Sequence, residues 1–100
     1  MAASDNGGQR FELHISAVVA ESVRKLFRQA ADAGKGKTVL TAYRRIVERL
    51  EADAADFGEP LYHLPNLRLE LRHAVVGLLA VDYAVSLARY QVYIKGFHLL

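Results

Sequence analysis

Apolar and polar side chains alternate in three consecutive runs near the end of the chain, at residues 67–72, 79–85 and 90–95. Successive side chains of a strand point to opposite faces of a sheet, so each run predicts one strand of an antiparallel sheet. The apolar face, which we expect to be buried, consists of Leu67, Leu69, Leu71, Leu79, Val81, Tyr83, Val85, Val92 and Ile94. We take the opposite face as the candidate site, with the polar residues Arg68, Glu70, Arg72, Asp82, Gln91, Tyr93 and Lys95.

The first half of the chain predicts one strand and two helices. Residues 10–16 alternate like the later runs, and Ser16 is a suitable N-cap for a helix that follows. Apolar residues then recur at the spacing of one helix face from 17 to about 33, and again from about 38 to 55. Gly34 begins a basic turn between these helices, and Gly58 with Pro60 ends the second one. Residues 61–64 indicate a further short strand.

The resulting order is β-α-α-β-β-β(-β), which is an α+β fold. Two amphipathic helices bury their apolar stripes best on a sheet, so we expect both on the leucine–valine face, with the first strand in the same sheet. Gly77 interrupts the alternation after residue 72. A single bulged residue between positions 73 and 79 would exchange the two faces assigned beyond it.

Composition and length indicate one domain. The chain has 100 residues, of which 52% are hydrophobic, and residues 10–100 suffice for a single core. Residues 1–9 are small and polar and are predicted to be a disordered tail. The chain shows neither an apolar run long enough for a bilayer nor the pattern of a signal peptide, so we expect a soluble, cytoplasmic protein without membrane contact.

The chemistry available to the chain is limited by its side chains. It has no cysteine, which excludes disulfides, thiolate metal sites and cysteine nucleophiles. The four histidines are scattered without a short two-histidine spacing, so no metal site is predicted. The net charge is +2, and from residue 61 onward four basic residues outnumber two acidic ones. The Gly-Lys-Gly-Lys-Thr string at 34–38 lacks the earlier glycine and the preceding strand of a phosphate loop, and it indicates a plain turn.

Four short segments follow one another in a recognisable order. They are Asp-Phe-Gly-Glu-Pro at 56–60, Leu-Glu-Leu-Arg at 69–72, Asp-Tyr-Ala-Val at 82–85 and Ile-Lys-Gly-Phe at 94–97. Together they resemble the RelE/ParE-like toxin superfamily of bacterial toxin–antitoxin systems. The resemblance covers about residues 10–100. It implies a short strand and two helices before a curved antiparallel sheet.

The resemblance also implies a function. Catalytic members of that superfamily cut messenger RNA on the ribosome without metal or cofactor, by driving the ribose 2′-hydroxyl onto its own phosphate. An antitoxin protein neutralises them. By this resemblance the chain is expected to be a toxin that cleaves mRNA and inhibits translation, with an antitoxin and the mRNA–ribosome complex as partners. Such chemistry needs a base, cations for the phosphorane and an acid for the leaving oxygen.

Residues of this chain can be assigned to those roles by the resemblance. Arg72 matches a phosphate-binding arginine, Lys95 or Glu70 would be the base, and His98 the acid. Tyr93 would orient or stack a nucleobase. The additional RNA contacts expected are Arg68, Gln91, Lys35 and Lys37.

Other interpretations of the same residues stay open. Ala80 stands where the superfamily strand usually carries an arginine, and Lys95 replaces a histidine. These departures favour a non-catalytic binding module of the same fold, either a gyrase-directed toxin or an inert remnant that docks a protein. Arg72 would then be a surface arginine paired with Glu70 or Asp82. His73 shares the phase of the leucines and is expected to be half-buried in the core.

Overall fold

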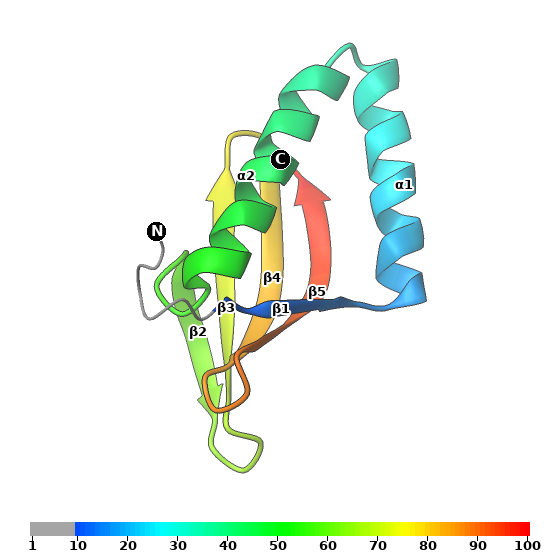
Figure 1. Ribbon diagram of the computed structural model, residues 1–100. Coiled ribbons are helices and arrows are strands. Elements are labelled where there is room, and N and C mark those ends of the chain that lie inside the picture. The colour runs from blue at the N-terminus through cyan, green and yellow to red at the C-terminus, as the bar shows by residue number, and fades with distance from the viewer. Residues whose placement is uncertain (1–9) are drawn as a thin grey trace.

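The computed structural model describes residues 10–100, so the predicted tail at residues 1–9 lies outside the described part. The elements follow the predicted α+β order (Figure 1). They are β1 (Glu12–Ile15), α1 (Ala17–Asp32), α2 (Gly36–Asp53), β2 (Glu59–Leu64), β3 (Leu69–Val76), β4 (Leu79–Ser86) and β5 (Gln91–Leu99). Within residues 10–100, neither helix is both long and apolar enough to span a bilayer.

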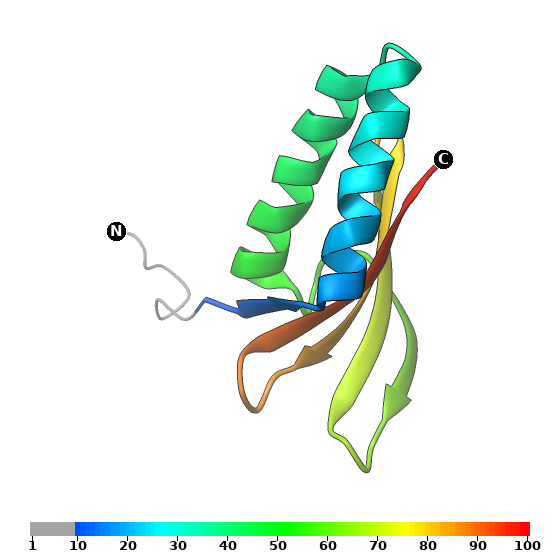
Figure 2. The ribbon, with the colours of Figure 1, turned by 90° about the vertical axis from the view of Figure 1, so that its right-hand side faces the viewer.

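The five strands form one sheet in the order β1-β5-β4-β3-β2. β1 pairs in parallel with β5, and the other neighbours are antiparallel. Both helices lie on the same side of the sheet (Figure 2). We call the helix-free surface of the sheet the open face. The β2–β3 and β4–β5 hairpins extend beyond the helices, at the end opposite to the α1–α2 turn (Figure 1).

The helices form where their apolar periodicity predicted them. The Ser16 hydroxyl caps α1 by accepting from the backbone N–H of Val19 at 3.1 Å. Gly34, with a φ of +75°, allows the tight turn between the helices, and α2 begins two residues earlier than predicted. The buried residues of the two helices are Val23, Leu26, Ala30, Val39, Ala42, Ile46 and Leu50.

The core between helices and sheet confirms the predicted faces of β4 and β5. The buried strand residues include Val81, Tyr83, Val85, Val92 and Ile94. Tyr83 is completely buried, and its hydroxyl lies within hydrogen-bonding distance of the carbonyls of Ala54 and Phe57. Burial raises the pKa of Tyr83 to about 12, against the smaller opposing effect of Arg72.

The predicted phase of β3 is wrong. Arg72 pairs directly with Tyr83, and His73 with Asp82. Because directly paired residues share a face, Glu70 and Arg72 lie on the helix side and Leu71 on the open face. The reason is the two-residue turn at Gly77, whose φ is +58°, which pairs Val76 with Leu79 and so fixes the register. The leucines at 67, 69 and 71, which were predicted for the core, thus lie outside it, and Leu67 is exposed.

Candidate functional site

Arg72 is buried on the helix side of the sheet, where it holds the segment that follows α2. Its Nε donates to the Phe57 carbonyl at 2.9 Å, and its Nη2 to the Gly58 carbonyl at 3.0 Å. Its Nη1 pairs with Glu70 at 2.6 Å. Burial lowers the pKa of Arg72, but the interactions with Glu70 and Tyr83 outweigh this effect and raise it. The arginine is therefore a charged structural clamp, and its predicted place on the open face is wrong.

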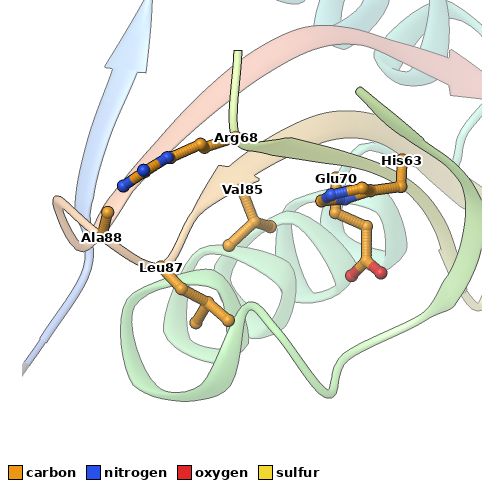
Figure 3. Close-up of a pocket in the computed structure, with 6 residues that line it drawn as sticks. All are labelled: His63, Arg68, Glu70, Val85, Leu87 and Ala88. Carbon is orange, nitrogen blue, oxygen red and sulfur yellow. The ribbon is translucent and has the colours of Figure 1, made fainter. Parts of the chain in front are cut away.

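Glu70 lies beside a second arginine at the end of the sheet. A pocket of about 300 Å³, which we call the helix-side pocket, is lined by His63, Arg68, Glu70, Val85, Leu87 and Ala88 (Figure 3). Arg68 comes from the turn before β3 and extends toward Ala88 (Figure 3). The Glu70 carboxylate accepts a hydrogen bond from Arg72 on the helix side of the sheet, so its predicted place on the open face is also wrong.

A second pocket lies on the open face, between the β2–β3 hairpin and the β4–β5 hairpin. This hairpin pocket is lined by Asn66, Leu67, Arg68, Leu69, Ser86, Ala88, Arg89 and Tyr93. Within residues 10–100, neither the Arg68 nor the Arg89 guanidinium forms an ion pair. Arg89 was not predicted, because an arginine in a hairpin turn carries no periodic signal. The pocket therefore combines two available cations with the ring of Tyr93.

Tyr93 is held by neighbours from β1 and β5. Its ring stacks on His14, with centroids 5.2 Å apart and an interplanar angle of 19°. Its hydroxyl donates to the side-chain oxygen of Gln91. The Gln91 amide and the His14 ring each bond to Glu12, at 3.4 and 3.1 Å. Tyr93 and Gln91 thus lie on the open face as predicted.

Lys95 occupies a β-bulge and is separated from Arg72 and Glu70, two of the other predicted catalytic residues. The register between β4 and β5 shifts between Asp82 and Tyr83, so Lys95 has no cross-strand partner on β4. It is exposed and borders a depression shared with His14 and Tyr93. Arg72 and Lys95 are therefore not brought together, because one is buried under the helices and the other lies on the surface.

Lys35 and Lys37 lie far from the hairpin pocket. They belong to the α1–α2 turn and the first turn of α2, at the opposite end of the molecule from the hairpins (Figure 1). The structure therefore places them outside the surface that carries Arg68 and Tyr93. Their predicted RNA contact stays a prediction.

The open face carries a His–Asp–His cluster that the sequence did not reveal. His73 Nδ1 lies 2.6 Å from Asp82 Oδ1, and His98 Nε2 lies 3.0 Å from Asp82 Oδ2. His73 is thus not in the core, and Asp82 does not pair with Arg72. Partial burial raises the pKa of Asp82, but the hydrogen bonds and charges of the two histidines together lower it below its usual value. No group of three or more potential ligands suited to a metal ion is present in residues 10–100.

We expect the Asp82→Asn variant to be less stable than the wild type at pH 7 by about 0.5 kcal/mol, because the carboxylate is more than a third exposed. The folded-state pKa of Asp82 is depressed, so its contribution is present above the unfolded pKa near 4 and is lost as the pH falls further. Urea unfolding at pH 7 and pH 3 measures this difference. An identical difference at both pH values would contradict the ionic role.

The open face therefore carries both the hairpin pocket and the His–Asp–His cluster. Tyr93 and His98 belong to them, while Arg72 and Glu70 do not. Comparisons with family models, with curated proteins and with solved structures found no match to this chain.

Proposed function

We propose that this protein is the toxin component of a toxin–antitoxin system of the RelE/ParE-like kind, and that it binds and cleaves messenger RNA on its open face to inhibit translation. The observation that carries the proposal is that Arg68, Arg89 and Tyr93 line one pocket. The motifs of the sequence and the order of its elements support the same family. An antitoxin that covers this face with a helix or strand would neutralise the protein in the cytoplasm.

The hairpin pocket has the chemistry of a single-stranded RNA site. Guanidinium groups bind phosphate through two parallel hydrogen bonds, and neither arginine is engaged by a carboxylate of the described chain. A nucleobase that stacks on a tyrosine ring gains about 1–3 kcal/mol. Single strands are the form of RNA whose bases are free to stack in this way.

A second candidate function is a non-catalytic binding module, directed at gyrase or at another protein. The burial of Arg72 favours it, because the residue that matched a phosphate-binding arginine is used to hold backbone carbonyls. This module would still arrest growth if it inhibited gyrase, but it would not bind RNA. Supercoiling assays with the purified protein distinguish it from an RNA-directed toxin.

The Arg68→Ala/Arg89→Ala double variant is expected to bind a short single-stranded RNA about tenfold more weakly than the wild type. The dependence of log affinity on log salt should become shallower by about 1.4, because two phosphate contacts are lost. Fluorescence anisotropy across a salt series measures both quantities. Induced expression should cause growth arrest with the wild type and weaker arrest with the variant.

The Arg28→Ala/Arg44→Ala double variant is the matched control. It removes the same net charge from exposed positions on α1 and α2, away from the hairpins. It should retain wild-type RNA affinity. Equal losses in the two double variants would show that net charge alone determines binding. Growth arrest by a wild-type protein that binds no RNA would favour the non-catalytic module.

A further inference from the structure

The His–Asp–His cluster connects three adjacent strands on the open face. His73 on β3 and Asp82 on β4 are direct cross-strand partners. Asp82 is paired on its other side with Gly96 of β5, and the position of a Cβ added there lies 3.8 Å from His98 Nε2. The imidazole of His98 thus lies beside Gly96 and reaches the Asp82 carboxylate. One carboxylate thus orients two imidazoles, one with each oxygen.

Each imidazole retains one unused nitrogen. His73 binds Asp82 through Nδ1 and His98 through Nε2. Within residues 10–100, no hydrogen bond engages Nε2 of His73 or Nδ1 of His98. The side chains are 39% and 58% exposed, so both nitrogens can meet a ligand. A carboxylate on one nitrogen of a neutral imidazole fixes the tautomer that leaves the other free to accept a proton.

Asp82 lies on the same face of β4 as Ser86, which borders the hairpin pocket. Its neighbours on the open face of β4 are Ala80 and Ala84, both with small side chains. Ala84 is paired with Tyr93, and Ser86 two residues further lines the hairpin pocket. From Asp82 to Ser86 the strand rises roughly 13 Å at about 3.3 Å per residue. A single strand of RNA that extended from the hairpin pocket along β4 would therefore reach the two histidines with its next nucleotides.

We propose that His73 and His98, oriented by Asp82, are the acid–base pair that cleaves RNA on the open face, an inference that rests on the proposed function. The neutral imidazole accepts the proton of the 2′-hydroxyl, and the 2′-oxygen forms a bond to phosphorus. The protonated imidazole donates its proton to the 5′-oxygen as the bond from phosphorus to that oxygen breaks. The products are a 2′,3′-cyclic phosphate and a 5′-hydroxyl, and no redox step is involved.

The rate of cleavage by His73 and His98 should depend on pH. The charged groups paired with or bonded to His73 are Asp82 on β4 and Glu59 of β2, which is its cross-strand partner. Lys95 in the bulge of β5 precedes Gly96, the cross-strand partner of Asp82. The cleavage rate should follow a bell-shaped pH profile, because one histidine must be neutral and the other protonated.

The test uses the purified full chain with a short RNA, free or bound as messenger on ribosomes, and with the same sequence in deoxyribose form as a substrate that cannot react. His73→Gln and His98→Gln should each lower the cleavage rate about 10²- to 10⁴-fold while leaving RNA affinity within about twofold. Each variant should also lose one limb of the pH profile. Asp82 acts by positioning the two histidines, so Asp82→Asn should lower the cleavage rate and shift its pH profile. His63→Gln, on β2 in the helix-side pocket, is the matched control and should keep the full rate.

The outcomes separate this inference from the proposed function. Cyclic phosphate products from the wild type that disappear in both histidine variants support the pair. RNA binding without cleavage by the wild type overturns the pair but leaves an RNA-binding toxin. Cleavage by His73→Gln or His98→Gln at the rate of His63→Gln also overturns it. A wild type that neither binds nor cleaves RNA overturns the proposed function and the pair together. A cooperative urea transition that begins well above the assay conditions confirms that each variant is folded.

Discussion

The Arg72→Ala variant is expected to lose about 3 kcal/mol of its free energy of unfolding. The substitution removes the guanidinium donors of the Phe57 and Gly58 carbonyls. The Phe57 carbonyl keeps only the Tyr83 hydroxyl, and a buried polar group that loses a partner costs about 1–3 kcal/mol. It also removes the partner of Glu70 in a pair whose arginine is only 8% exposed. Urea-induced unfolding, followed by far-ultraviolet circular dichroism, measures the loss.

Arg24→Ala is the control for this substitution. Arg24 forms an ion pair with Glu21 on the solvent side of α1, and exposed pairs of this kind contribute well under 1 kcal/mol. Similar stabilities of the two variants would contradict the role of Arg72 as a clamp. A loss of growth arrest in an Arg72 variant therefore says nothing about phosphate binding unless the fold is shown to be intact.

The Gly58→Ala variant is expected to be destabilised by about 4 kcal/mol, a large part of the roughly 5–15 kcal/mol by which native domains are stable. Gly58 has a φ of +72°, which costs an alanine about 1–2 kcal/mol. An added Cβ would also lie 2.4 Å from the His73 carbonyl oxygen and 2.8 Å from the Ala74 Cβ. These atoms belong to β3 and cannot move without disturbing its pairing with β4, which adds a steric cost of about 1–3 kcal/mol. Soluble yield and urea unfolding measure the effect.

The Gly34→Ala variant separates the cost of the backbone conformation from the cost of the steric contact. Gly34 has a φ of +75°, close to that of Gly58, but no atom lies within 4 Å of an added Cβ. This variant should lose only about 1–2 kcal/mol, the cost of the backbone conformation alone. If both alanine variants lost the same amount, the contact between Gly58 and β3 would not be tight.

The elements of the fold were predictable because their periodicity is strong and local. Both helices and the buried faces of β4 and β5 follow directly from the spacing of apolar residues. The prediction of the buried face of β3 was wrong for a reason that is not local. Its leucines at 67, 69 and 71 alternate well, but the turn at Gly77 sets the register, and a shift of one residue exchanges the faces.

The His–Asp–His cluster was less predictable than the fold because its three residues come together only through the pairing of β3, β4 and β5. His73 and His98 are 9 and 16 residues from Asp82, spacings that carry no motif. With the phase of β3 reversed, His73 was assigned to the core and Arg72 to the surface. Tyr93 and Gln91 were placed correctly because β5 alternates without interruption up to the bulge at Lys95.

The parallel pairing of β1 with β5 has a consequence for synthesis of the chain. β1 ends at Ile15 and its partner begins at Gln91, so the first strand emerges long before the strand that completes its hydrogen bonds. At about 5–20 residues per second, translation of the intervening segment takes roughly 4–15 s. Tyr93 and His98 both belong to the late strand. A nascent polypeptide therefore has no complete open face until β5 has left the ribosome.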